Sequence, residues 1–196
     1  MMVKICGITN REDALAAIEG GASALGFNFY PSSSRYLDPD HAAELIAQLP
    51  AEVWKVGVFV NESPQRITEV ASRASLDIAQ LHNNLGQAIS LSHIRIWQAT
   101  QVDENFRLTN LDQLGAEAVL LDTAICGGTG RTFDWSKAAG ATKVKIILAG
   151  GLDANNVREA IAAVHPWGVD ACSRIESSPG RKDHVKMAQF LREATA

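Results

Sequence analysis

The sequence predicts an α/β protein, a (β/α)8 barrel in which residues 1–196 form a single compact domain. Short apolar runs typical of strands alternate with helical patterns along the whole chain, which implies a parallel sheet with right-handed crossovers. Eight such strand–helix units imply closure into a barrel, for which about 200 residues is the low end of the known range. The alternative is an open doubly wound sheet, which usually has fewer strands and a glycine-rich first turn. The first turn here, Cys6-Gly7-Ile8-Thr9, is not glycine-rich.

The first half of the chain contains clear start and stop signals. The apolar run at 3–6 is a short strand that ends at Gly7, and Thr9 or Asn10 can cap the helix that follows. Ser63 precedes a proline in the first helical turn, which is typical of a helix start. The predicted elements are strands 3–6, 23–28, 53–60 and 77–81, and helices 10–19, 39–48, 63–74 and 84–92.

The second half continues the alternation with more irregular helices. The predicted elements are strands 94–99, 118–122, 144–149 and 168–173, and helices 104–114, 134–140, 153–164 and 182–194. The pattern at 104–114 is weak, whereas Asp153 to Asn156 open an amphipathic segment. The long irregular stretches, 29–38 and 123–133, each follow a strand. In a barrel both therefore lie on the face where such proteins build their sites.

Composition excludes several classes of function. The net charge is −4 and there is no basic block, so nucleic acid is not an expected partner. No apolar run approaches the ~20 residues of a membrane span, and the polar stretch at 10–13 argues against a secretory leader. The three cysteines are odd in number, far apart and without zinc spacing. We therefore expect reduced thiols, no metal and a cytoplasmic protein.

A thiol and a carboxyl stand at the ends of two predicted strands. Cys6 closes the first strand and Asp122 closes the sixth. A thiol and a carboxyl in one cavity suit a reaction that takes a proton from carbon and gives one to oxygen. The alternatives are an inert buried cysteine and an aspartate that caps the loop after its strand. As a base, Cys6 would need a lowered pKa, and Lys4, on the same strand face, is a candidate to tune it. Cys126 and Cys172 are interpreted as small fillers or loop residues.

The ends of two neighbouring predicted strands indicate an anion site. Gly150 and Gly151 follow the seventh strand, Ser173 ends the eighth and Arg174 follows it, and the loops at these strand ends are the usual phosphate site of barrels. A tight turn is the alternative for the paired glycines. The segment 127–132 lacks the end of a nucleotide-binding loop and is interpreted as a mobile lid.

Two further side chains are candidates for substrate binding. Arg35 lies in the polar loop after the second strand, where its guanidinium can hold a carboxylate in bidentate fashion, although a solvated arginine is an alternative. His82 follows the fourth strand and is either a donor towards the site or a packed strand-end residue. The four tryptophans are interpreted as packing residues.

Short motifs typical of one enzyme family occur in order along the chain, in every strand–helix unit but the fifth. They are Lys4-Ile5-Cys6-Gly7-Ile8-Thr9, Leu25-Gly26-Phe27 with Ser34-Arg35, Val56-Gly57-Val58-Phe59-Val60-Asn61, Gln80-Leu81-His82, Leu121-Asp122, Gly127-Gly128-Thr129-Gly130 with Phe133-Asp134-Trp135, Ala149-Gly150-Gly151-Leu152, and Pro179-Gly180 with Lys182-Asp183. As a set, they resemble the phosphoribosylanthranilate isomerase family.

The resemblance implies a TIM barrel enzyme that carries out an Amadori rearrangement in tryptophan biosynthesis, without metal or cofactor. The substrate would be N-(5-phosphoribosyl)anthranilate and the product 1-(2-carboxyphenylamino)-1-deoxy-D-ribulose 5-phosphate. By resemblance, Asp122 is the general acid, Cys6 is the general base and Arg35 holds the anthranilate carboxylate. The loops at 150–151 and 173–174 resemble the phosphate site, and His82 is kept among the substrate-binding residues. The expected partner is this small substrate, and the chain is expected to be a monomer or a homodimer.

The chain departs from the family pattern in two places. Asn83 and Asn84 replace glycine and an acidic residue, and asparagine tolerates the left-handed geometry of such a turn. Arg174 stands where the family has glycine, and it either blocks the phosphate or binds it directly. Two other functions stay open: another phosphosugar-processing barrel enzyme, and a non-catalytic barrel that binds a phosphometabolite. The absence of a catalytic lysine at a strand end argues against a decarboxylating cyclase.

Overall fold

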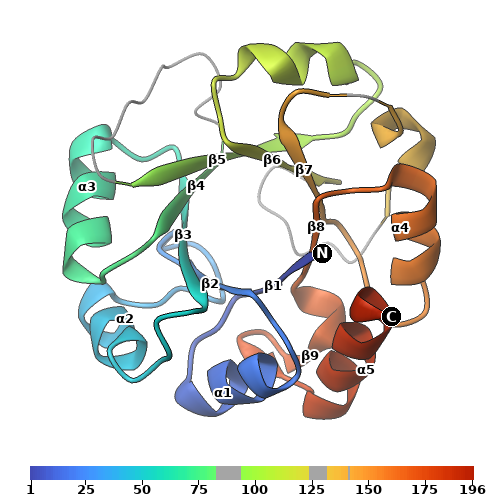
Figure 1. The fold of residues 1–196 in the computed structure, drawn as a ribbon. Helices are drawn as coiled ribbons and strands as arrows, with labels where there is room; N and C mark the ends of the chain where they lie inside the picture. Colours follow the sequence, from blue (N-terminus) through green and yellow to red (C-terminus); the bar gives the residue numbers. More distant parts are fainter. Residues whose placement is uncertain (83–93, 124–131, 141) are drawn as a thin grey trace.

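The structure is a computed structural model that describes residues 1–82, 94–123, 132–140 and 142–196. In these residues, eight parallel strands close into a barrel in chain order, with β8 pairing back onto β1 (Figure 1). The strands are β1 (Met2–Cys6), β2 (Ala24–Asn28), β3 (Trp54–Val60), β4 (Ile78–His82), β5 (Arg95–Gln101), β6 (Ala118–Asp122), β7 (Lys145–Leu148) and β8 (Gly168–Ala171). The fold class predicted from the sequence is confirmed.

Helical segments surround the barrel on its outer face (Figure 1). They are α1 (Arg11–Glu19), α2 (Pro39–Ile46), α3 (Pro64–Arg73), α4 (Val157–Val164) and α5 (His184–Thr195), with 3-10 segments η1 (Leu108–Gln113), η2 (Trp135–Ala138) and η3 (Ser173–Ile175). The helix predicted at 84–92 lies outside the described residues. None of the described helices is long and apolar enough to cross a membrane.

Local sequence explains where the helices begin. The side chain of Asn10 accepts the backbone N–H of Asp13, and that of Ser63 accepts the N–H of Arg66, so both predicted caps form. α4 begins four residues later than predicted, because Asp153 accepts the N–H of Asn155 and holds a turn before the helix.

Two predicted helices are 3-10 segments. The 104–114 segment contains residues that favour turns, such as Asn110 and Asp112, and it forms only η1. The 134–140 segment forms only the short η2, where Asp134 caps the N–H of Ser136.

Side chains alternate between the inside and the outside of the barrel. On β1, Val3 and Ile5 pack among the residues that join the strands to the helices, whereas Met2, Lys4 and Cys6 point inward. At the amino-terminal end of the strands, three tryptophans fill the interior, with ring centroids 6.0 to 6.2 Å apart. They are Trp54, Trp97 and Trp167. The site therefore opens at the other end, as barrels require.

The chain after β8 makes a structure that the sequence did not predict. Ser173, expected at the end of a strand, begins η3 instead. η3 is followed by a small antiparallel hairpin of β9 (Glu176–Ser178) and β10 (Arg181–Lys182). Gly180 lies in its turn with a φ of 80°, a left-handed conformation that favours glycine. This hairpin brings Glu176 and Lys182 to the edge of the site.

Candidate active site

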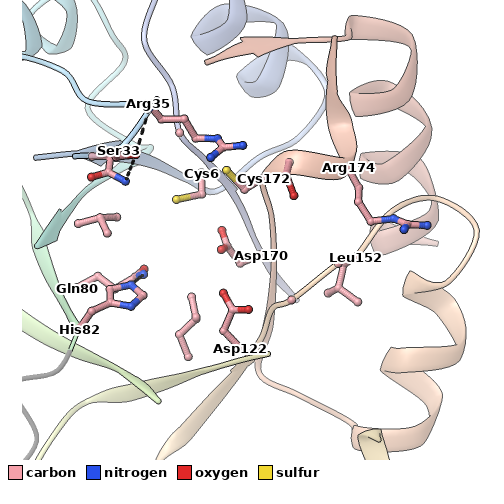
Figure 2. Close-up of a pocket in the computed structure, with 17 residues that line it drawn as sticks. Cys6, Ser33, Arg35, Gln80, His82, Asp122, Leu152, Asp170, Cys172 and Arg174 are labelled. Atoms are coloured by element: carbon pink, nitrogen blue, oxygen red, sulfur yellow. Dashed lines mark hydrogen bonds between the residues drawn. The ribbon is translucent and has the colours of Figure 1, made fainter. Parts of the chain in front are cut away.

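One pocket at the carboxyl ends of the strands contains every site residue predicted from the sequence (Figure 2). These residues are Cys6, Arg35, His82, Asp122, Gly150, Gly151, Ser173 and Arg174. Inward-facing residues of the strands and their following loops complete the wall, among them Gln80, Asp170 and Cys172. The alternation of side chains along each strand thus brings together groups that are far apart in the sequence.

A buried ion pair forms the floor beneath the thiol of Cys6. β1 and β8 pair in a register that places Lys4 opposite Asp170, and Lys4 Nζ lies 2.9 Å from Asp170 Oδ1. Burial opposes the charge of Lys4, but Asp170 and Cys6 together raise its pKa above the ordinary value. Burial raises the pKa of Asp170 to about 7, against the lowering effect of Lys4. A cation is therefore held directly below the thiol.

The second strand leaves room for these groups. A Cβ added to Gly26 would lie 2.8 Å from Cys6 Sγ and 3.0 Å from Lys4 Nζ. The ammonium and the sulfur thus share one small space, which supports the tuning role that the sequence suggested for Lys4. In this environment the neighbouring Cys172 thiol and the Lys4 ammonium lower the pKa of Cys6 well below its ordinary value, against the effect of burial.

Asp122 is both a pocket residue and a cap. Its side chain is buried, and Oδ1 accepts the backbone N–H of Thr123 at 2.6 Å and the Thr123 hydroxyl at 3.2 Å. Gly150 packs against it with a φ of 81°, and a Cβ added there would lie 3.0 Å from the same Oδ1. The carboxyl is held from two sides while still facing the pocket (Figure 2).

Arg35 reaches the pocket with its guanidinium already fixed. Nε lies 2.9 Å from Glu176 Oε1 and Nη2 lies 2.7 Å from Glu176 Oε2, a bidentate pair. The same carboxylate accepts Lys182 Nζ at 3.0 Å. Arg35 and Lys182 lower the pKa of Glu176 although its burial acts in the opposite direction. A Cβ added to Gly7, whose φ is 74°, would lie 2.7 Å from Arg35 Cδ, so this glycine makes room for the arginine.

The predicted phosphate loops lie side by side at the mouth of β7 and β8. Gly150 and Gly151 have φ of 81° and 65°, left-handed conformations that favour glycine, and neither residue has a side chain of its own to cover its backbone N–H. Arg174 extends away from the centre of the pocket (Figure 2). Its Nη2 lies 2.7 Å from Asp153 Oδ2, and Nε donates to the same oxygen. The arginine side chain therefore does not fill the space between these two loops.

His82 is buried and its orientation is set by Gln80. The Nε2 atoms of the two side chains lie 3.0 Å apart. Which of the two nitrogens donates depends on the tautomer of the ring. The imidazole is a pocket-lining group that Gln80 contacts from the same strand. The segment interpreted as a lid lies, at 127–131, outside the described residues.

A family model decides between the functions left open by the sequence. The model for N-(5'-phosphoribosyl)anthranilate (PRA) isomerase matches residues 3–193, nearly the whole chain. The chain belongs to the PRA isomerase family. The fold and the family expected from the sequence are thereby confirmed, and with them the enzyme class, an isomerase.

Individual PRA isomerases agree with this match. One from Solibacter usitatus is 50% identical over 199 residues, which cover 100% of this chain and 98% of the relative. A crystal structure of a phosphoribosyl anthranilate isomerase in complex with reduced 1-(o-carboxyphenylamino)-1-deoxyribulose 5-phosphate is 38% identical, with a TM-score of 0.83, covering 100% of this chain and 98% of that chain. A structure of monomers generated from the dimeric enzyme of Thermotoga maritima is also 38% identical, with a TM-score of 0.84 and the same coverage.

Four residues of this PRA isomerase site were not singled out for it by the sequence. Cys172 was taken for a filler, and Asp170, Glu176 and Gln80 were not considered as site residues. The sequence signal for the first two was the period of two along a strand: Asp170 and Cys172 alternate across β8 and its end as Lys4 and Cys6 alternate on β1. Glu176 depends on the hairpin, which has no comparable pattern.

Proposed function

We propose that this PRA isomerase converts N-(5-phosphoribosyl)anthranilate to 1-(2-carboxyphenylamino)-1-deoxy-D-ribulose 5-phosphate in tryptophan biosynthesis, with Cys6 as general base and Asp122 as general acid. One observation carries the proposal: the Cys6 thiol, whose pKa is lowered by its surroundings, and the buried Asp122 carboxyl face the same pocket from β1 and β6. A base and an acid held separately can act on different atoms of one sugar.

The reaction follows from these two groups. The Asp122 carboxyl gives its proton to the ribose ring oxygen while the bond from that oxygen to the first carbon breaks, and the aniline nitrogen's lone pair forms an iminium. The iminium acidifies the neighbouring C–H, so the Cys6 thiolate is a sufficient base to take that proton. The electron pair moves onto nitrogen and gives an enolamine. This tautomerises to the ketone as the first carbon gains a proton and the enol oxygen loses one.

Arg35 is the proposed ligand of the anthranilate carboxylate. Glu176 takes its Nε and Nη2 edge, which fixes the plane of the guanidinium. Among the described residues Nη1 donates no hydrogen bond, so its N–H groups are available to a substrate carboxylate. Because the ion pair with Glu176 already orders the Arg35 side chain, substrate binding loses less side-chain entropy than it would with a free arginine.

The proposed phosphate site consists of backbone amides rather than the Arg174 side chain. The loop at Gly150 and Gly151 and the turn that begins at Ser173 line the same side of the pocket. Backbone N–H groups in such turns bind phosphate well. Since Arg174 pairs with Asp153, it contributes charge near the phosphate without occupying its place. Arg174 in place of the family glycine, which suggested a non-catalytic binding barrel, is therefore compatible with binding of the substrate phosphate.

The remaining expectations follow from family and composition. We infer that residues 1–196 form one domain, that His82 contacts the substrate, and that no metal or cofactor is needed. The solution state is a monomer or a homodimer, which light scattering during size-exclusion chromatography distinguishes. The cytoplasmic location stays a prediction from cysteine usage.

Turnover of phosphoribosylanthranilate tests the proposal directly. Wild-type protein is expected to change the fluorescence of the substrate as the product forms, whereas Cys6→Ala and Asp122→Asn each lower kcat by about a thousandfold or more, since each removes a proton-transfer group. Unchanged circular dichroism and thermal unfolding show that both variants are folded. Absence of turnover by folded wild-type protein, or full activity of Cys6→Ala, would contradict the assigned roles.

A further inference from the structure

We propose that Arg174 is a positioning residue for substrate binding, which joins the two loops of the phosphate site through its ion pair with Asp153. Arg174 stands where the family has glycine, so the family pattern does not supply this contact. The use of the loops for phosphate rests on the proposed function. The ion pair itself does not, because it is defined by its own contacts.

The two loops follow neighbouring strands whose backbone pairing is short. β7 and β8 pair over two residues each, 147–148 with 168–169, whereas β1 and β8 pair over four. In the described part of the chain, the pairing of β7 with β8 ends before the glycines at 150–151 and before Ser173. A contact between the loops themselves therefore contributes more to their relative position than it would beside a longer pair of strands.

Arg174 makes such a contact from the loop after β8. It lies in η3, directly after the pocket residue Ser173, and its side chain extends away from the centre of the pocket (Figure 2). Nη2 and Nε each lie 2.7 Å from Asp153 Oδ2 in the loop after β7. The Asp153 side chain is only 13% exposed, and the Arg174 side chain is 43% exposed. Two donors on one well-covered carboxylate oxygen fix the direction of the arginine.

Asp153 is in turn connected to the glycine turn through Asn156. The backbone N–H of Asp153 donates to Asn156 Oδ1 at 2.9 Å, and Asn156 Nδ2 donates to the carbonyl oxygen of Gly151 at 2.9 Å. Asp153 Oδ1 accepts the backbone N–H of Asn155 at 2.8 Å, which holds the carboxylate in place. A continuous path of hydrogen bonds therefore leads from Arg174 after β8 to Gly151 after β7.

The position of the two loops matters because backbone N–H groups from both are the proposed ligands of the phosphate. Such groups bind an anion well when they already point at one place, whereas ordering a loop during binding weakens the affinity. The Arg174–Asp153 pair orders both loops before the ligand arrives. Because the charges of the pair oppose each other, we expect its main effect on phosphate to come from loop position.

Three roles of Arg174 predict different signs for two substitutions. If the guanidinium attracts the phosphate directly, loss of the Arg174 side chain weakens phosphate binding, but loss of the Asp153 charge strengthens it. If Arg174 blocks the site, loss of its side chain strengthens binding. If the pair joins the loops, both losses weaken binding, because either one breaks the same contact.

Titration with inorganic phosphate tests the inference without turnover. The NMR signals of the Gly151 and Ser173 amides report the Kd at the proposed site, in about 0.15 M salt, where charges farther away than ~8 Å are screened. Arg174→Ala and Asp153→Asn are each expected to raise this Kd about fivefold, since ordering then accompanies binding. The double variant should show no further rise, because the two residues share one contact. Arg174→Lys keeps a cation for Asp153 and should recover part of the loss.

Arg66→Gln is the control for net charge. It removes one positive charge from an exposed ion pair on α3 and is expected to leave the phosphate Kd unchanged. Circular dichroism and urea unfolding show that the variants are folded. The inference is overturned if either single variant binds phosphate as tightly as wild type or more tightly, if the two losses add in the double variant, or if phosphate moves neither amide signal.

Turnover separates this inference from the proposed function. KM for phosphoribosylanthranilate should rise in the same order of variants, whereas kcat changes by less than about twofold, because the proposed acid and base are not altered. Absent turnover with the expected phosphate pattern refutes the proposed function only. Normal turnover of all variants with an unchanged phosphate Kd refutes this inference only.

Discussion

At the scale of single residues, Gly150 decides where the Asp122 carboxyl can lie. Its left-handed φ and the 3.0 Å separation between a built Cβ and Asp122 Oδ1 mean that any side chain there displaces the acid. The thiol of Cys6 depends in the same way on Gly26. Both proposed catalytic groups thus pack against glycines, which have no reactive side chain of their own.

Gly150→Ala tests this dependence. The methyl group is expected to displace Asp122 and lower kcat by about tenfold, because small misplacements of reacting groups cost rate. Gly115→Ala is the matched control, since Gly115 also has a left-handed φ, of 62°, but a Cβ there meets nothing within 4 Å. Both variants should lose about 1 kcal/mol of unfolding free energy for the strained backbone, measured by urea denaturation. Equal kcat for the two variants would show that Gly150 does not position the acid.

The sequence identifies those site residues that stand at the end of an apolar, strand-like run. Cys6 and Asp122 each end an apolar run, and strand ends meet at one face of a barrel. Cys172 directly follows β8, and its place at the pocket wall depends on how β8 pairs with β1. A single sequence does not contain that pairing, because register across the closing seam depends on the shear of the whole barrel.

At the scale of elements, the β9–β10 hairpin supports Arg35, the proposed ligand of the substrate carboxylate. It supplies Glu176, which fixes Arg35, and Lys182, which shares the same carboxylate. Its strands have three and two residues, too short for an alternating pattern to be recognised in the sequence. The helices, in contrast, were predicted correctly where caps such as Asn10 and Ser63 fix their starts. At η1 and η2 the predicted α-helices are short 3-10 segments, because turn-forming residues compete with the α-helix.

Glu176→Gln tests the hairpin's role. Loss of the charge leaves Lys182, whose side chain is fully buried, without its carboxylate, and such a change typically costs about 3 kcal/mol of unfolding free energy. Arg35 loses its anchor, so KM for phosphoribosylanthranilate is expected to rise more than kcat falls. Glu69→Gln is the control, because its pair with Arg66 is exposed and contributes less than about 1 kcal/mol. The support is refuted if the two variants unfold at the same urea concentration and bind substrate equally.

At the scale of the whole molecule, the barrel is closed where its first strand meets its last. Backbone pairing runs from Met2 to Ile5 along β1 and from Gly168 to Ala171 along β8. Lys4 and Asp170 form the side-chain link across this seam, inside the barrel. The same pair that supports the Cys6 thiol therefore also joins the two ends of the sheet, so stability and reactivity depend on one contact.

This double role predicts a particular pattern of stability across the seam. Asp170→Asn leaves the fully buried Lys4 without its partner charge and is expected to cost about 3 to 5 kcal/mol of unfolding free energy in urea. Replacing both residues, as Lys4→Met with Asp170→Val, removes the buried charges together, and the double variant should recover most of that loss because apolar groups of similar size fill the same space. Additive losses in the double variant would show that the two side chains stabilise the barrel independently. Recovered stability should be accompanied by slower iodoacetamide labelling of Cys6 at neutral pH, since the cation that lowers the pKa of the thiol is gone.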